Sequence, residues 1–272
     1  MGKRRRRHRD PQRLIVVIGV AVLAIVVAGF GVFVVNKINQ PDRSAAEMQR
    51  ETERIATEAA AQNAQFEQER IDKQNAAKAQ IVFPADRPYT VAFIGDSVTA
   101  GSYATTVEAT WPNVLAAKLT ETGPVEVAML AEPGRRSSDA LTLDIPPADL
   151  TLVMLGNNDA MAEAGVEGFQ QTYPALLAKV RASSPTGALI CLSPWFAASW
   201  KPGYHSTVKE ACEAAGGEYV DISATHQPRN RAQVGDPSYA GTATDDGHPN
   251  DAGHKAIADK VLSQMFITAP GQ

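Results

Sequence analysis

Residues 89–265 alternate between short apolar runs and longer stretches of helix-forming sequence. This alternation predicts parallel strands joined by helices, and therefore a sheet with helices packed on both faces. The apolar runs are nearly continuous, as expected for strands that are buried on both sides. The expected strands are residues 89–95, 125–131, 149–156, 187–193 and 217–223, and the expected helices are residues 111–122, 137–144, 166–183, 206–216 and a last helix from Asn250 or Asp251.

Polar residues and glycines follow the expected strands, at the edge where open α/β sheets bind their ligands. The first strand stops at Gly-Asp-Ser, which places Ser97 in a turn of small residues. The second strand is followed by Gly134, the third by Asn158, and the segment before the last helix contains Asp245 and His248. We therefore expect residues that are distant in the sequence to meet at one edge of the sheet.

These five residues form a set suited to acyl transfer. A serine hydroxyl is a weak nucleophile until a base removes its proton, and His248 can act as that base near neutral pH. Asp245 lies three residues before the histidine and can accept its second imidazole N–H. The backbone N–H groups of Ser97 and Gly134 and the side-chain amide of Asn158 can stabilise the oxyanion of a tetrahedral intermediate.

The motifs GDSVTAG, the turn at Gly134, GNND and DDGH resemble the four signature blocks of the SGNH (GDSL-type) hydrolase superfamily, in the same order. The resemblance covers about residues 88–268. It implies a flavodoxin-like three-layer α/β/α sandwich with no obligatory cofactor and no metal. The turn at Gly134 departs most from the family pattern, because it has only a lone glycine before two arginines. The implied catalytic residues are Ser97, His248 and Asp245, and the implied oxyanion-hole residues are Ser97, Gly134 and Asn158.

Several residues near these motifs have other expected roles. Asp96 and Asp159 are expected to brace their own loops by hydrogen bonds. Asp246 is adjacent to Asp245 and is an alternative partner for the catalytic histidine. His254 is expected to be an exposed residue of the last helix, whereas no partner is evident for His205 or His226.

Three aromatic residues follow the fourth expected strand in the motif SPWFAASW. Trp195, Phe196 and Trp200 have two possible roles that the sequence leaves open. They wall a substrate pocket for an acyl group or a sugar, or they pack as part of the core.

The N-terminal 35 residues join a basic segment to an uncharged one. Residues 1–13 include a cluster of arginines, and residues 14–35 carry no charge. About 20 apolar residues span the hydrocarbon core of a bilayer. The run is longer than the h-region of a signal peptide, and no clear cleavage site follows it. We therefore expect a transmembrane signal-anchor with a cytoplasmic N-terminus, and a cleaved signal peptide is the alternative.

Residues 36–82 are expected to form a helical stalk, because most of this segment is rich in Ala, Glu and Gln. Met48 and Ile55 are one heptad apart, but polar residues occupy the next two heptad positions, which interrupts a dimer seam. A solvated helix is therefore expected, and a weak coiled coil is the alternative. The expected hydrolase domain is residues 83–272.

The hydrolase domain carries 21 acidic and 12 basic residues, a net charge of −9. Nucleic-acid binding requires a basic surface, so no nucleic-acid partner is expected. Cys191 and Cys212 would lie in an oxidising compartment, where a disulfide and two buried thiols are both open interpretations. Their spacing excludes a CxxC redox or zinc motif.

Together these features predict a membrane-anchored, extracytoplasmic serine esterase that hydrolyses carboxylic esters through an acyl-enzyme. The expected substrate is an O-acyl group of a cell-envelope glycan, a lipid ester or a short acyl ester. An acyltransferase that uses the same site and a non-catalytic cell-wall binding module are the alternatives.

Overall fold

The computed structural model describes residues 45–270. The predicted basic tail, residues 1–13, and the predicted transmembrane segment, residues 14–35, lie outside this range. None of the helices between residues 45 and 270 combines the length and the apolar character that crossing a membrane requires.

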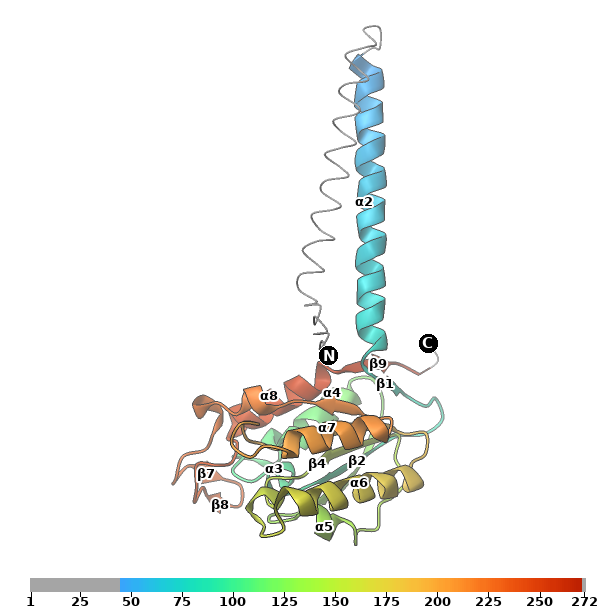
Figure 1. The fold of residues 1–272 in the computed structure, drawn as a ribbon. Coiled ribbons are helices and arrows are strands. Elements are labelled where there is room, and N and C mark those ends of the chain that lie inside the picture. The colour runs from blue at the N-terminus through green and yellow to red at the C-terminus, as the bar shows by residue number, and fades with distance from the viewer. Residues whose placement is uncertain (1–44, 271–272) are drawn as a thin grey trace, which may run out of the picture. The chain divides into compact units, whose positions relative to one another are not determined.

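Helix α2 (Ala45–Ala76) occupies most of the predicted stalk (Figure 1). Its 32 residues correspond to a length of about 48 Å at 1.5 Å per residue. Arg54 forms ion pairs with Glu51 and Glu58, both at 2.6 Å, on the exposed surface of this helix. Ile55 and Phe66 are exposed as well. Most of the described side chains of this helix are therefore exposed.

A five-stranded parallel sheet forms the centre of the hydrolase region. The strand order is β3-β2-β4-β5-β6, and every neighbouring pair is parallel. All five predicted strands are confirmed: the first two have the predicted bounds, and the other three are shorter by one to three residues at their ends. The strands are β2 (Tyr89–Gly95), β3 (Val125–Ala131), β4 (Leu150–Met154), β5 (Ala188–Leu192) and β6 (Glu218–Val220).

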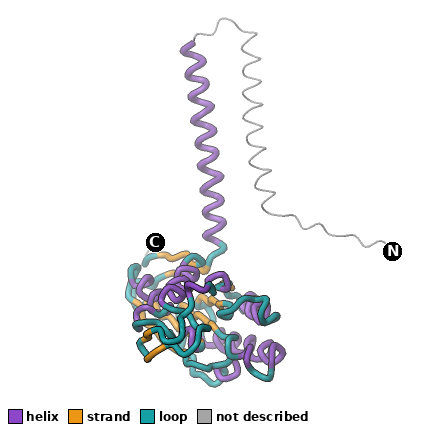
Figure 2. The backbone as a smooth tube through the Cα atoms, turned by 90° about the vertical axis from the view of Figure 1, so that its left-hand side faces the viewer, coloured by secondary structure: helices purple, strands orange, loops and turns teal. Residues whose placement is uncertain are grey.

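Helices cover both faces of this sheet, which gives the expected three layers (Figures 1 and 2). Alternate strand residues face opposite helices: Phe93 packs in the cluster with α4 and α8, and Ile94 packs in the cluster with α6 and α7. Asn250 caps the last helix by accepting a hydrogen bond from the Gly253 amide, as predicted. The helices are α3 (Ser97–Ala100), α4 (Trp111–Thr120), α5 (Ser137–Ala140), α6 (Gly165–Ser183), α7 (Tyr204–Ala214) and α8 (Asp251–Leu262).

The prediction that all strands are buried on both faces is wrong for β3. Val127 and Met129 of this strand are 43% and 42% exposed. The physical reason is that β3 lies at the edge of the sheet and pairs only with β2. Its hydrophobic residues are therefore covered on fewer sides than those of the central strands.

Two small sheets were not predicted. Strand β1 (Ala79–Val82), at the end of the predicted stalk segment, pairs in parallel with β9 (Met265–Thr268). Strands β7 (Pro237–Ser238) and β8 (Gly241–Thr242) form a short antiparallel pair in the segment before the last helix.

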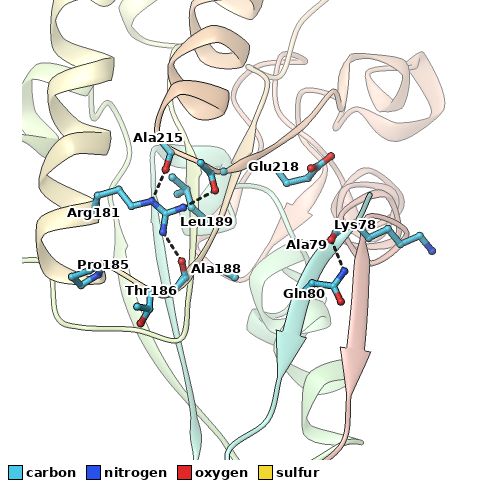
Figure 3. A pocket seen from close by; sticks show the side chains of 13 residues that line it. Lys78, Ala79, Gln80, Arg181, Pro185, Thr186, Ala188, Leu189, Ala215 and Glu218 are labelled. Atoms are coloured by element: carbon cyan, nitrogen blue, oxygen red, sulfur yellow. Dashed lines mark hydrogen bonds between the residues drawn. The ribbon is translucent and has the colours of Figure 1, made fainter. Parts of the chain in front are cut away.

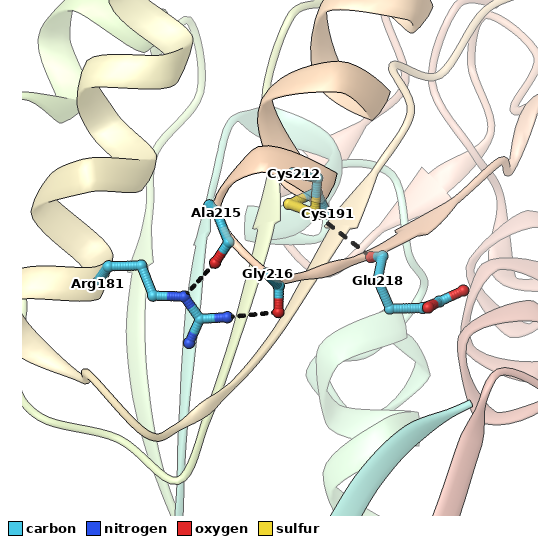
Figure 4. The surroundings of a disulfide bond; sticks show 6 residues. All are labelled: Arg181, Cys191, Cys212, Ala215, Gly216 and Glu218. Atoms are coloured by element: carbon cyan, nitrogen blue, oxygen red, sulfur yellow. Dashed lines mark hydrogen bonds between the residues drawn. A yellow bond between two sulfur atoms is a disulfide. The ribbon is translucent and has the colours of Figure 1, made fainter. Parts of the chain in front are cut away.

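A disulfide joins Cys191 of β5 to Cys212 of α7, and both residues are buried (Figure 4). Beside it, the guanidinium of Arg181 donates hydrogen bonds to the carbonyl oxygens of Ala215, Gly187 and Gly216 (Figures 3 and 4). These bonds tie the end of α6 to β5 and to the end of α7. The arginine lines a cavity of about 590 Å³, but its hydrogen bonds to backbone oxygens indicate a structural role.

Candidate functional site

Small residues form the turn after β2 that carries Ser97, which is only 9% exposed and lines the catalytic cavity. Asp96 caps α3 by accepting a hydrogen bond from the amide of Val98, so Ser97 is the first residue of that helix. The helix ends after four residues at Gly101, whose φ of 89° lies in the left-handed region that favours glycine. A Cβ on Gly95 would lie 2.1 Å from the Oγ1 atom of Thr99, so a larger residue does not fit there.

Ser97, His248 and Asp245 form a continuous chain of hydrogen bonds. The Oγ atom of Ser97 lies 2.8 Å from Nε2 of His248. The Nδ1 atom of His248 lies 2.8 Å from Oδ1 of Asp245. Because an ionised carboxylate only accepts hydrogen bonds, the proton of the neutral imidazole belongs on Nδ1. Nε2 then faces the serine as an acceptor, which is the arrangement that a general base requires.

Asp245 is held by three donors. Besides the imidazole of His248, the amide of Gly247 donates to Oδ1 at 2.8 Å and the hydroxyl of Tyr103 donates to Oδ2 at 2.8 Å. Burial raises the pKa of the Asp245 carboxyl, but the hydrogen bonds from His248, Tyr103 and Gly247 outweigh burial and leave the pKa below its usual value. The carboxylate is thereby kept charged and fixed beside the imidazole.

Tyr103 is a site residue that the sequence analysis missed. Among residues 45–270 it is the only non-glycine residue with a positive φ, at 67°. Its ring packs edge-on against His248, with centroids 4.9 Å apart, and its hydroxyl lies 2.7 Å from Oγ1 of Thr244. Since the tyrosine proton goes to Asp245, the threonine hydroxyl donates to the tyrosine oxygen. Tyr103 belongs to no signature block, and no sequence signal identifies it.

Two of the three predicted oxyanion donors, Ser97 and Asn158, line the cavity into which the catalytic side chains open. Asn158 donates one amide hydrogen to the carbonyl oxygen of Arg135 at 3.1 Å, which leaves the second hydrogen of the amide group available. The N–H of Ser97 lies at the start of α3, where helix amides have no intrahelical acceptor. Gly134 adopts a φ of 83° in the turn before Arg135, but it is not among the residues that line the cavity.

A buried hydrogen-bond network stabilises the turn that carries Ser97. Asp96 is fully buried, and its Oδ2 atom accepts a hydrogen bond from the Asn157 amide at 2.8 Å. The Oδ1 atom of Asn157 accepts from the backbone amide of Trp195 at 2.7 Å. Burial raises the pKa of Asp96 to about 6, although the bonds from Asn157 and Val98 oppose this rise. The predicted bracing role of Asp96 is confirmed, whereas the role of Asn157 was not foreseen.

Asp159 braces a loop, as predicted. Its carboxylate accepts hydrogen bonds from the backbone amide of Ser137 and from the hydroxyl of the same residue. Asp159 follows β4 and Ser137 begins α5, so this contact joins two of the loops at the carboxyl edge of the sheet.

The prediction that His254 is exposed is wrong. The residue is fully buried, and its Nε2 atom donates to the carbonyl oxygen of Ser102 at 3.1 Å. Its Nδ1 atom accepts from the backbone amide of Trp111 at 3.3 Å. Burial lowers the pKa of His254 to about 4, so the imidazole is neutral. The reason for the error is that α8 packs against α4, and His254 lies on the contact face.

The other two histidines lie near the aromatic residues. His205 of α7 is buried with both ring nitrogens lacking a hydrogen-bond partner among the described residues, and its ring lies 5.4 Å from that of Phe196. The ring of His226 packs edge-on against Trp195, with centroids 5.2 Å apart.

The catalytic side chains open into a cavity of about 580 Å³. Trp195 and Phe196 are largely buried and still contribute to the cavity wall, so both interpretations of these residues apply. Trp200 is 51% exposed at the rim. The lining residues are Ser97, Val98, Asn157, Asn158, Met161, Trp195, Phe196, Ala197, Trp200, His226, Arg231, Asp245, Asp246, Gly247 and His248.

Asp245, and not Asp246, is the carboxylate that contacts His248. The side chain of Asp246 is 64% exposed, and its Oδ2 atom lies 3.6 Å from Nη1 of Arg231. The sequence analysis did not single out Arg231, because the segment before the last helix has no regular pattern.

Residues 93–256 match the GDSL-like lipase/acylhydrolase family. A GDSL lipase of Mycobacterium tuberculosis is 25% identical over 205 residues, which cover 66% of this chain and 83% of the relative.

Solved structures share the fold. A phospholipase A1 from Streptomyces albidoflavus superimposes with a TM-score of 0.55 at 18% identity, covering 65% of this chain and 100% of the other. A catalytic mutant of an acetylxylan esterase from Geobacillus stearothermophilus gives a TM-score of 0.53 at 16% identity, covering 67% and 94%. At these identities the structural likeness concerns the fold alone.

Proposed function

Because the chain belongs to the GDSL-like lipase/acylhydrolase family, we propose that it is a serine esterase that hydrolyses carboxylic esters through an acyl-enzyme. The observation that carries this proposal is the hydrogen-bond chain from Ser97 through His248 to Asp245. This chain supplies a nucleophile, a base and a group that fixes the base, which are the parts that acyl transfer requires.

In the first half of the proposed reaction, Nε2 of His248 takes the hydroxyl proton of Ser97 while Oγ attacks the ester carbonyl carbon. The carbonyl electrons move to oxygen, and the oxyanion is stabilised by the N–H of Ser97 and the side-chain amide of Asn158, the two predicted donors that line the cavity. The intermediate then collapses, the bond to the alcohol oxygen breaks, and that oxygen takes the proton from His248. The alcohol departs and the acyl group stays on Ser97.

In the second half, water replaces the alcohol. His248 takes a proton from the water as its oxygen attacks the acyl carbon, and the same oxyanion donors stabilise the second intermediate. Collapse of this intermediate breaks the bond to Oγ, which regains the proton from His248. The products are a carboxylic acid and the free enzyme. Throughout both halves Asp245 keeps the imidazole oriented and stabilises its charged form.

We further propose that the substrate is an O-acyl group of a cell-envelope glycan or a short acyl ester. The cavity is wide, and Trp195 and Trp200 line it with aromatic surface of the kind that packs against sugars or acyl chains. The relatives named above include an acetylxylan esterase and a phospholipase, so the family fold accommodates both kinds of ester.

The proposed location is outside the cytoplasmic membrane, with residues 14–35 as a single-pass anchor and residues 1–13 in the cytoplasm. The basic segment before an uncharged run supports this orientation. The disulfide between Cys191 and Cys212 also supports it, because disulfides persist in oxidising compartments. Protease added to spheroplasts is expected to release the hydrolase domain, and a fully protected domain would contradict the orientation.

A panel of p-nitrophenyl esters of increasing chain length tests the proposed activity. We expect the full chain to hydrolyse acetyl or other short esters without added metal, because the proposed site needs only side-chain and backbone groups. A fall in kcat/KM with increasing chain length would agree with a short-acyl substrate. A protein inert toward every ester of the panel would contradict the proposal and favour a binding module.

A further inference from the structure

We propose that Arg231 forms a subsite that binds a negatively charged oxygen group, a carboxylate or a phosphate, carried by the ester substrate. The inference rests on the proposed esterase function, because this subsite belongs to the same cavity as Ser97 and His248. It adds a substrate class to that function, namely esters with an anionic group on the part of the molecule that fills the cavity.

Arg231 places a positive charge in the catalytic cavity of a domain that is acidic. The domain has a net charge of −9. Among the described residues that line the catalytic cavity, Arg231 is the only lysine or arginine. Burial and the nearby charge of Arg231 both lower the pKa of His226, so that imidazole is neutral at physiological pH. Beside it, Arg231 therefore supplies a fixed positive charge to a cavity on an acidic protein.

The guanidinium of Arg231 has unused hydrogen-bonding capacity. Its side chain is 29% exposed, and it donates no hydrogen bond to any residue of the described chain. The nearest carboxylate oxygen, on Asp246, lies 3.6 Å away, beyond hydrogen-bond distance. An arginine presents its donors as a planar fork that matches a carboxylate or a phosphate. The unused fork therefore suits an anionic group of the substrate.

Asp246 does not block this subsite. Its side chain is 64% exposed, and ion pairs between exposed side chains contribute little to stability. A substrate anion that forms two short hydrogen bonds with the guanidinium can therefore displace the long contact with Asp246.

The backbone of Arg231 is fixed relative to the catalytic histidine. Arg231 forms an isolated antiparallel bridge with Pro249, and its carbonyl oxygen accepts a hydrogen bond from the Asn250 side chain at 3.0 Å. The next amide, of Ala232, donates to the carbonyl oxygen of His248 at 3.0 Å. An anion bound by Arg231 would therefore sit at a defined place relative to the ester that Ser97 attacks.

The test compares three acetyl esters with the same scissile bond. Monoacetyl glucose is neutral, monoacetyl glucuronate carries a carboxylate, and monoacetyl glucose phosphate carries a phosphate. We expect the wild-type chain to hydrolyse at least one anionic ester with a kcat/KM about tenfold above that of the neutral ester, since hydrogen bonds between charged groups are stronger than those between neutral ones. Higher ionic strength should reduce this preference. The preferred ester distinguishes a carboxylate from a phosphate.

Three variants test whether Arg231 causes the preference for anionic esters. Arg231→Gln should bring the ratio of anionic to neutral kcat/KM down to about one. Asp246→Asn should raise the ratio, because it removes the competing carboxylate. Arg229→Gln is the matched control, since Arg229 is exposed in the neighbouring turn and does not line the cavity, and it should leave the ratio unchanged.

The outcomes separate this inference from the proposed function. Equal kcat/KM values for all three sugar esters, or an anionic preference that survives in Arg231→Gln, would overturn the subsite while p-nitrophenyl acetate is still hydrolysed. If the wild-type chain does not hydrolyse p-nitrophenyl acetate, the proposed esterase function is wrong, and so is the subsite that rests on it.

Discussion

The hydroxyl of Tyr103 donates a hydrogen bond to Oδ2 of Asp245, the carboxylate oxygen that does not face His248. Both oxygens of the carboxylate are thus occupied, and the group cannot rotate without losing a bond. Tyr103 reaches this position with a left-handed backbone, which costs a residue with a side chain about 1–2 kcal/mol. We infer that Tyr103 is a positioning residue that fixes Asp245 beside the catalytic base.

Replacing this tyrosine by phenylalanine tests that role. Tyr103→Phe keeps the ring against His248 and removes only the hydroxyl. We expect kcat to fall about tenfold, the value of one lost hydrogen bond to a charged group, with little change in KM. Loss of the donor should also raise the pKa of Asp245, and a more basic carboxylate holds a proton on the adjacent imidazole more strongly, so the acid limb of the pH–rate profile should move to higher pH. Steady-state kinetics across a pH series measures both effects.

Tyr239 provides the matched control. Its hydroxyl donates to the backbone oxygen of Ala100, near the same turn, and in the described part of the chain it forms no hydrogen bond with Ser97, His248 or Asp245. Tyr239→Phe should therefore leave the pH profile unchanged. Identical profiles for both variants and the wild type would show that the Tyr103 hydroxyl has no positioning role.

Asn158 is expected to contribute one oxyanion donor beside the N–H of Ser97. Asn158→Ala should lower kcat by about 10²–10³, the usual cost of losing one such donor. The amide also donates to the Arg135 carbonyl, so unfolding by urea should be measured to separate catalysis from stability. A kcat within a factor of three of the wild type, in a protein of normal stability, would remove Asn158 from the oxyanion hole.

The sequence predicted the parts of the site that lie in short motifs at strand ends. Ser97 and Asn158 follow directly after strands, and the topology of a parallel sheet brings such residues together. The contact of Tyr103 with Asp245 joins residues 142 positions apart, between two irregular loops. No periodicity or motif reports such a contact. The same holds for Arg231, which lies in a segment without long helices or strands.

Burial of individual positions was harder to predict than the order of the elements. His254 occurs in a short polar part of the helix sequence, and only the packing of α8 on α4 shows that it faces inward. Val127 and Met129 form an apolar run like those of the central strands, but the position of β3 at the edge of the sheet leaves them exposed. Sheet order depends on the whole topology, which local sequence does not specify.

The buried His254 makes stability depend on pH. Its folded pKa, about 4, lies below the ordinary value of 6.5. Between these pH values the unfolded chain binds a proton at His254 that the folded chain does not bind. The free energy of unfolding is therefore highest, as far as this group is concerned, above pH 6.5, and it decreases as the pH falls toward 4. The loss amounts to about 3 kcal/mol. Asp96 acts in the opposite direction, because its raised pKa of about 6 stabilises the folded state only at low pH.

A variant separates the two groups. His254→Gln keeps a hydrogen-bond acceptor and a donor but does not titrate. Its stability should therefore lack the pH dependence that His254 causes and keep the pH dependence that Asp96 causes. The difference in unfolding free energy between wild type and variant should therefore be smaller at pH 5 than at pH 7, as measured by urea denaturation. An equal difference at the two pH values would show that His254 is not the titrating group.

The disulfide is expected to stabilise the hydrolase domain. A cross-link between residues 21 positions apart contributes roughly 3 kcal/mol in the chain-entropy model. The double variant Cys191→Ala, Cys212→Ala should therefore unfold at clearly lower urea concentration than the oxidised wild type. Thiol titration of denatured, unreduced protein should find no free thiol. Two free thiols in protein from its native compartment would contradict the bond.

The central claim is that Ser97 is the nucleophile of an acyl-enzyme reaction. The most direct measurement is covalent labelling by a fluorophosphonate probe, followed by mass spectrometry of the intact protein and of its peptides. The account predicts one adduct, on Ser97, with no adduct on Ser97→Ala and a fall in ester hydrolysis by several orders of magnitude in that variant. Labelling at another residue, or wild-type hydrolysis by Ser97→Ala, would contradict it.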